Sequence, residues 1–347
     1  MPDFASPAFA PRSRGGGGGG ARLAGGASRL AAAPRAGVAA AAPDAERVWR
    51  APFAVDLGLT VAPHRRGLRD PAFHTDPDGT VWRASFTPEG PGTIRLRQRG
   101  DGCEPGSVVE ATAWGPGAEW LLEGVPDLLG AGDVPEEFEP RDPVLREAVR
   151  RCPGLRIGRS GRVFEALAPA VLEQKVLTAE AWRAWRYLVR RFGRPAPGVP
   201  WLRVPPPPET WIRIPSWEWH RSGAEAVRAR TIIGAARVAA RLEALPAGGG
   251  TAADPRLRSL PGIGEWTSAE IRQRAAGDAD AVSVGDYHLP GLVGWSLAGG
   301  KVDDAGMLEL LAPYAGHRHR VTRLLELTGA APPRRGPRLP VRDYRGF

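Results

Sequence analysis

The chain has very few thiols and no long apolar run. Its 347 residues include only two cysteines, Cys103 and Cys152, which excludes a disulfide framework and any four-thiolate zinc or iron–sulfur site within one chain. Arginine, proline and glycine interrupt every apolar stretch before it reaches membrane-spanning length. The arginine-containing N-terminus also lacks the apolar core of a signal peptide. We therefore expect no membrane association and a reducing, cytoplasmic location.

Lysine is equally scarce. Of the 47 basic Lys and Arg residues, only Lys175 and Lys301 are lysines. Arginine keeps its proton near neutral pH and cannot act as an amine nucleophile. Covalent imine chemistry would therefore depend on one of these two side chains.

The positive charge is unevenly distributed. The net charge is +9 at pH 7, yet residues 44–150 are net acidic while residues 151–330 and both ends are net basic. Cationic side chains that neutralise phosphates supply most non-specific affinity for nucleic acids. The asymmetry favours a polyanionic partner for the second half of the chain, and a merely solvated basic surface is the alternative.

The first third of the chain changes from low complexity to alternation. Residues 1–46, which contain six consecutive glycines, predict a disordered tail. Within residues 47–133, apolar and polar residues alternate in three segments, which predicts an antiparallel meander over 80–86, 93–99 and 107–114. Residues 118–130 predict a short helix that ends at its proline and glycine. This region is predicted to be a small α+β domain.

From residue 142 to residue 330 the apolar residues recur at helical spacing. We predict two helices or one kinked helix over 163–193, a proline-rich loop over 195–211, and a long helix over 222–245 with Ser222 as N-cap. The predicted fold class is therefore α+β, with a small antiparallel-sheet N-terminal domain followed by an all-α domain. A basic tail, residues 331–347, completes the chain.

The segment LPGIG joins two of the predicted helices. Gly262 and Gly264 flank Ile263, and glycine allows a very short turn whose backbone N–H groups point outward. These groups and the dipole of the next helix would form an anion site for a DNA phosphate, with Leu260 and Ile263 anchoring the turn to the core. The alternative is an ordinary helix connection.

The continuation of this hairpin carries a family resemblance. PGIGEWTSAEI followed by VSVGDYHLP resembles the helix-hairpin-helix DNA glycosylases, and above all the 3-methyladenine DNA glycosylase II (AlkA-type) branch. The strand-rich first domain, an EQKV helix at 173–176 and GHRHRV at 316–321 follow that family's order, so the resemblance covers roughly residues 50–330. It implies a monomeric, nucleoid-associated enzyme of base excision repair that acts on double-stranded DNA containing a damaged base. No metal or other cofactor is required, although the hairpin can hold a monovalent cation.

The resemblance implies a role for Asp286. It corresponds to the family's catalytic aspartate, and a fixed carboxylate can stabilise the oxocarbenium character that develops when an N-glycosidic bond breaks. The alternative is an N-cap on a helix that begins at Tyr287, and both roles are compatible.

The resemblance also argues against strand cleavage. Members of the superfamily that cleave DNA carry a lysine two residues after the second glycine of the hairpin. Trp266 stands at that position here. We therefore predict a monofunctional glycosylase, which removes the base and leaves the strand intact.

The base pocket shows both matches and departures. Trp266 and Tyr287 match residues that line the pocket in similar enzymes, where an electron-rich ring suits a cationic alkylated purine. Core packing is the alternative for Trp266. At Glu270 and His317 the family leads us to expect aromatics, and at Lys175 an apolar wedge that fills the gap left by the flipped base. Lys175 could instead contact phosphate or be solvated.

These residues predict a DNA glycosylase for alkylated purines such as 3-methyladenine. Two alternatives stay open. One is a non-catalytic DNA-binding protein that has kept the scaffold and lost turnover through Glu270 and His317. The other is a glycosylase for deaminated or oxidised bases.

Overall fold

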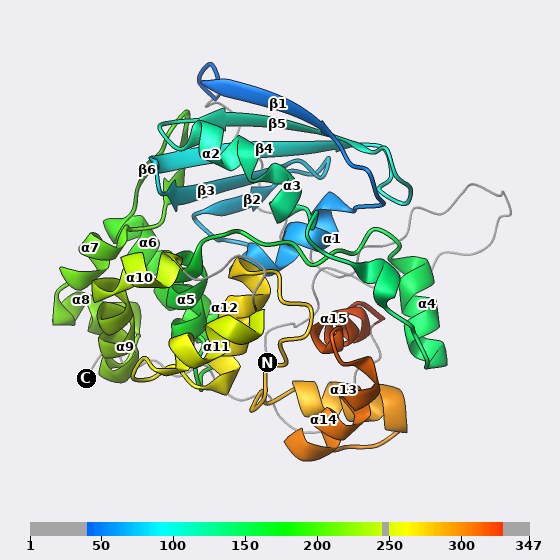
Figure 1. Cartoon of the computed structure of the whole chain (residues 1–347). Coiled ribbons are helices and arrows are strands. Elements are labelled where there is room, and N and C mark those ends of the chain that lie inside the picture. Colours follow the sequence, from blue (N-terminus) through cyan, green and yellow to red (C-terminus); the bar gives the residue numbers. More distant parts are fainter. Residues whose placement is uncertain (1–39, 245–249, 329–347) are drawn as a thin grey trace, which may run out of the picture.

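The computed structural model describes residues 40–244 and 250–328 and contains one large sheet followed by two groups of helices (Figure 1). The sheet is antiparallel with strand order β1-β5-β4-β3-β2. Its strands are β1 (Ala45–Arg50), β2 (Phe73–Thr75), β3 (Val81–Thr87), β4 (Gly90–Arg99) and β5 (Val108–Trp114). The three strands predicted from alternation, β3 to β5, are confirmed, and the two edge strands were not predicted.

The predicted N-terminal tail, residues 1–46, includes two residues that belong to the first strand. Ala45 pairs with Ala113 and Glu46 with Thr112, so both belong to β1. Residues 1–39 lie outside the described residues, as does the predicted basic tail, 331–347.

Short helices cover one face of the sheet. Residues 118–130 form two helices, α2 (Ala118–Glu123) and α3 (Val125–Leu128), which meet at Gly124. Their apolar side chains pack on the inward residues of β4 and β5. Before β2 the chain forms α1 (Leu57–Val61) and the 3-10 helix η1 (Ala62–His64), which extends from the sheet toward the helices (Figure 1).

The prediction that residues 195–211 form a loop is wrong. They contain a hairpin, β6 (Arg194–Ala196) and β7 (Val199–Val204), and the start of α7 (Pro208–Ile212). The hairpin packs against the large sheet through a small core around Trp82, Trp114 and Leu202. Proline is tolerated in a two-stranded ribbon because many N–H groups of such a ribbon need no partner strand. The second domain is therefore helical with one added hairpin.

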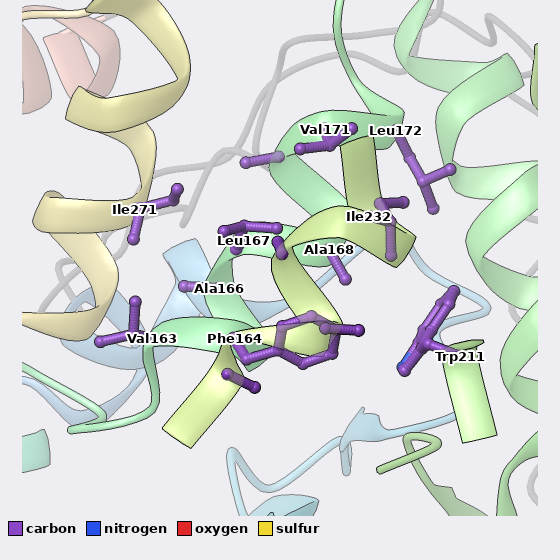
Figure 2. Packing of buried hydrophobic residues seen from close by; sticks show 14 of the residues in the cluster. Val163, Phe164, Ala166, Leu167, Ala168, Val171, Leu172, Trp211, Ile232 and Ile271 are labelled. Atoms are coloured by element: carbon purple, nitrogen blue, oxygen red, sulfur yellow. The ribbon is translucent and has the colours of Figure 1, made fainter. Parts of the chain in front are cut away.

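The first group of helices surrounds α5 (Val163–Leu172). All residues of α5 except Glu165 are buried, as expected for a helix that is packed on every side. Figure 2 shows Phe164 of α5 on the side of Trp211 of α7, and Leu167 of α5 on the side of Ile271. The other helices of this group are α6 (Thr178–Phe192), α8 (Ser216–Ser222), α9 (Ala226–Arg237), α10 (Ala239–Glu243), α11 (Gly250–Arg258) and α12 (Glu265–Ala275).

Two local predictions within this group are wrong. Ser222 is the last residue of α8 and caps no following helix, because Gly223 adopts a left-handed conformation that ends the helix. The predicted helix over 222–245 is instead the pair α9 and α10. EQKV, residues 173–176, is a turn between α5 and α6, in which Lys175 has a φ of +52°.

The second group consists of α4 (Pro143–Arg151), α13 (Leu289–Ala298), α14 (Asp304–Leu311) and α15 (Arg318–Thr328). It has its own core, which includes Leu145, Val293 and Leu325. The segment 276–288 leads from α12 in the first group to α13 in the second (Figure 1). No helix among the described residues is long and apolar enough to cross a membrane.

Candidate functional site

The glycine turn lies between α11 and α12 and is held by the core of the first helix group. Ile263 is buried in that core, and Leu260 packs against it. Gly262 has a φ of +86°, and a Cβ atom built on it would lie 2.2 Å from Oγ1 of Thr231 on α9. Gly262 and Gly264 are themselves exposed. The turn is therefore packed tightly from below and open on its outer side.

The outer side of the turn leads into the start of α12. Gly264 is the N-cap residue and offers no side-chain acceptor to the first turn. The first N–H groups of a helix have no partner within it, and the helix dipole makes this end attractive to anions. This geometry is compatible with the anion site expected from the sequence, which stays a prediction.

The turn that contains Lys175 lies against this hairpin. Gln174 donates from Nε2 to the carbonyl of Gly262 at 2.9 Å and to Oγ1 of Thr267 at 2.8 Å. Lys175 follows directly and is exposed. The carbonyl of Gly262 therefore already accepts the side-chain amide of Gln174. A monovalent cation at the hairpin stays a prediction.

We expect Gly262→Ala to destabilise the fold by about 1–3 kcal/mol, because the new methyl group meets Thr231 and the backbone conformation disfavours alanine. Gly264→Ala is the matched control: its φ is −92°, and an added Cβ meets nothing within 4 Å. Urea unfolding of both variants measures the difference. Equal losses of stability would contradict the tight packing of the hairpin on α9.

Asp286 is fixed by three donors at the end of segment 276–288. Its Oδ1 accepts the backbone N–H groups of His288, at 2.7 Å, and Leu289, at 3.0 Å. Its Oδ2 accepts Nε1 of Trp266 at 3.1 Å. Asp286 is half-buried. The carboxylate is thus held in one orientation and keeps partial access to solvent.

These contacts bear on both interpretations of Asp286. One oxygen supports the start of α13, which begins at Leu289 rather than at Tyr287. The other oxygen accepts the indole N–H of Trp266, which lies two residues after Gly264 and is the second residue of α12. A capping role and a place beside the hairpin therefore occur together.

The structure does not gather the predicted pocket residues around Trp266. Tyr287 is 86% exposed, and its ring meets His288 edge-on at 4.9 Å. His317 is buried in the second helix group, where its Nδ1 accepts Nε of Arg320 at 3.2 Å. Burial, and then the charge of Arg320, lower the pKa of His317. Its contacts are those of a structural histidine.

Glu270 lies one turn after Trp266 and points toward segment 276–288. Its Oε1 accepts the hydroxyl of Ser283 at 2.6 Å. Its Oε2 accepts Nη1 of Arg274 at 2.8 Å. The side chain is only 13% exposed. Both carboxylate oxygens are therefore occupied by protein donors.

A further buried histidine, His319 on α15, gives a pH prediction. Burial, followed by the charges of Arg323 and Arg274, holds its pKa well below the ordinary value. The unfolded state therefore binds the proton first, so stability is complete above about pH 6.5 and falls by up to about 1.4 kcal/mol per pH unit below it. Urea unfolding between pH 7.5 and 5.5 should show a flatter dependence for His319→Gln. The control is His74→Gln, which changes an exposed histidine. A dependence of stability on pH that is as steep in His319→Gln as in the wild type would contradict the lowered pKa of His319.

Sequence reasoning missed three residues that hold this site. Gln174 fixes the hairpin, and Ser283 and Arg274 fix Glu270. Each lies close to a residue that was considered: Gln174 beside Lys175, Ser283 three positions before Asp286, and Arg274 one turn after Glu270. A search for partners at helical spacing could have suggested Arg274. No group of three or more metal-binding side chains occurs among the described residues.

Comparisons with known proteins find relatives of similar sequence and of similar fold. No protein-family model matches the chain. The chain is 30% identical over 250 residues to the "Probable bifunctional transcriptional activator/DNA repair enzyme AlkA" of two Mycobacterium tuberculosis strains, over 69% of this chain and 48% of that protein. The chain spans about half the length of these curated relatives.

Solved structures of similar fold cover most of the chain. A 3-methyladenine DNA glycosylase from Archaeoglobus fulgidus superposes with a TM-score of 0.67 at 20% identity, over 81% of this chain and 98% of that one. An 8-oxoguanine glycosylase/lyase from Clostridium acetobutylicum, in complex with double-stranded DNA, gives 0.61 at 13% identity, over 82% and 97%. The resemblance to the AlkA-type branch and the α+β fold class are thereby confirmed.

Proposed function

We propose that the chain is a monofunctional DNA glycosylase of base excision repair that removes alkylated purines such as 3-methyladenine from double-stranded DNA. The observation that carries the proposal is the hydrogen bond to Asp286 from Trp266, which follows the Gly262–Gly264 turn by two residues. A phosphate bound at the turn would bring the neighbouring deoxyribose close to this carboxylate. We further propose that it acts as a monomer in the cytoplasm, on the nucleoid, and needs no cofactor.

Hydrolysis follows from the chemistry of a fixed carboxylate. As the bond between C1′ and the base nitrogen breaks, its electron pair leaves with the base and the sugar becomes oxocarbenium-like. The negative charge of Asp286 stabilises that cation and can orient a water molecule toward C1′. A purine that carries a positive charge from alkylation departs neutral and needs no proton donor. The water molecule adds its oxygen to C1′ and gives one proton to Asp286, which passes it to solvent, so the products are the free base and an abasic site.

Strand cleavage is not part of the proposal. An imine at C1′ requires an amine beside the sugar, and the residue at the corresponding position of α12 is Trp266. Lys175 lies in the exposed turn beside the hairpin, and Lys301 is exposed between α13 and α14. We therefore assign Lys175 to phosphate contact or to the gap left by a flipped base.

One observation favours a different outcome. Within residues 40–244 and 250–328, the rings of Tyr287 and His317 contact other residues than Trp266, so these three side chains form no aromatic cage for a cationic base. A glycosylase for neutral deaminated or oxidised bases, or a non-catalytic DNA-binding protein, is compatible with this arrangement.

The test uses duplexes that each contain one 3-methyladenine, 7-methylguanine, hypoxanthine or 8-oxoguanine. We expect abasic sites from the alkylated duplexes, with strand breaks only after alkali. Breaks without alkali, or an adduct trapped by borohydride, would contradict a monofunctional mechanism. Retained DNA binding with no release of any of the four bases would establish the non-catalytic alternative.

A further inference from the structure

One face of α12 holds the segment that carries Asp286. Trp266, Glu270 and Gln273 are spaced four and three residues apart, so they project from the same side of the helix. Each of them makes a hydrogen bond to residues 281–286. This segment contains neither helix nor strand. Its position relative to α12 therefore depends on these side chains.

Ser283 is the central contact. It donates its hydroxyl proton to Glu270 at 2.6 Å and accepts Nε2 of Gln273 at 3.0 Å. Gln273 also donates to the carbonyl of Ala281 at 2.9 Å. The carbonyl of Ser283 then accepts the backbone N–H of Asp286 at 3.2 Å. A displacement of Ser283 would therefore move the turn that presents Asp286.

Arg274 connects Glu270 to η1, which follows α1 below the large sheet. Its Nη1 donates to Glu270 at 2.8 Å, and its Nε donates to the carbonyl of Pro63 in η1 at 2.9 Å. The ion pair is largely shielded, with 15% and 13% of the two side chains exposed. A shielded carboxylate is costly unless its oxygens are paired. Arg274 and Ser283 supply that pairing.

We propose that Glu270 is a positioning residue that fixes the Asp286 turn on α12, and that it does not contact the base. This positioning role takes the place of the pocket role expected for Glu270, because both of its carboxylate oxygens bind Ser283 and Arg274. Groups that act on a transition state must be held to within about 0.5 Å, and a segment without secondary structure needs such supports. The effect on rate rests on the proposed function, whereas the effect on local order does not.

The chain offers a closely matched control on the opposite side of α12. Asp254 of α11 also accepts hydrogen bonds from a serine and an arginine of α12. The donors are the hydroxyl of Ser268, at 2.6 Å, and Nη1 of Arg272, at 3.1 Å. These contacts do not involve residues 281–286. Asp254→Asn therefore tests the loss of a similar network elsewhere on the same helix.

The experiment measures hydrogen exchange at the indole N–H of Trp266 and at the amides of His288 and Leu289, together with single-turnover base release and DNA affinity. Glu270→Ala and Ser283→Ala should each speed exchange about 10-fold or more and slow release roughly 10- to 100-fold, with DNA affinity unchanged. Glu270→Gln keeps an acceptor for Ser283 and should lose less. The double variant Glu270→Ala/Ser283→Ala should lose less than the sum of the two single variants, since both remove the shared contact between Glu270 and Ser283.

Exchange at these three N–H groups that stays as in the wild type in both Glu270→Ala and Ser283→Ala would overturn the proposal. So would a change in the preferred lesion with local exchange unaltered, because that result means contact with the base. Equal exchange effects in Asp254→Asn would also overturn it. If Glu270→Ala does not fold, Glu270→Gln and Ser283→Ala provide the same comparison. A wild-type protein that releases no base would refute the proposed function, and the exchange measurements would still decide the positioning role.

Discussion

Asp286→Asn should reduce base release by about 10²- to 10³-fold without weakening the binding of DNA. Asparagine has nearly the same size, and its oxygen can still accept the backbone N–H groups of His288 and Leu289, so α13 should start as before. The negative charge needed to stabilise an oxocarbenium-like sugar is lost. The amide NH₂ would then face the indole N–H of Trp266, two donors that cannot bond to each other.

Single-turnover release of 3-methyladenine and the affinity for an undamaged duplex measure the two halves of this prediction. Asp303→Asn is the matched control, since Asp303 caps α14 by accepting the N–H of Gly306 and is not part of the site. Its activity should equal that of the wild type. Wild-type release by Asp286→Asn would contradict a catalytic carboxylate at this position and leave only its capping role.

Local patterns predicted the parts of the fold that depend on neighbouring residues in the sequence. Alternation over 80–86, 93–99 and 107–114 identified the central strands because inward and outward side chains alternate along a strand. The glycine hairpin was recognisable because a positive φ at Gly262 needs glycine. These features require no knowledge of distant partners.

The errors arose where distant partners decide the structure. Residues 195–211 are rich in proline, yet β7 is stabilised by packing against Trp82 and Trp114, which lie far away in the sequence. The expectation that Glu270 lines the base pocket came from the family resemblance and stays untested. The direction of this side chain depends on Ser283 and Arg274, and Arg274 is itself held by Pro63 in η1. The pair of Glu270 and Arg274 has helical i,i+4 spacing, whereas the contacts with Ser283 and Pro63 leave no pattern in the local sequence.

The second large effect is expected in the interior, where α15 meets the segment before α4. Arg320 forms an ion pair with Asp133, and the two side chains are only 3% and 2% exposed. The same carboxylate accepts the backbone N–H of Ile157 at 2.8 Å, and Nε of Arg320 donates to His317 at 3.2 Å. The pair therefore connects α15 to segments on both sides of α4.

Arg320→Ala should lower the free energy of unfolding by about 3–5 kcal/mol, because it leaves the Asp133 carboxylate buried without its counter-charge. Asp133→Asn combined with Arg320→Met should be more stable than Arg320→Ala alone, since no unpaired charge stays inside. Glu147→Ala removes the exposed pair with Arg150 and should cost less than about 1 kcal/mol. Urea unfolding at pH 7.5 compares the three variants. If Arg320→Ala lost no more stability than Glu147→Ala, the buried ion pair would contribute no more to stability than an exposed one. The pairing of Asp133 with Arg320 would then not be what holds α15 in place.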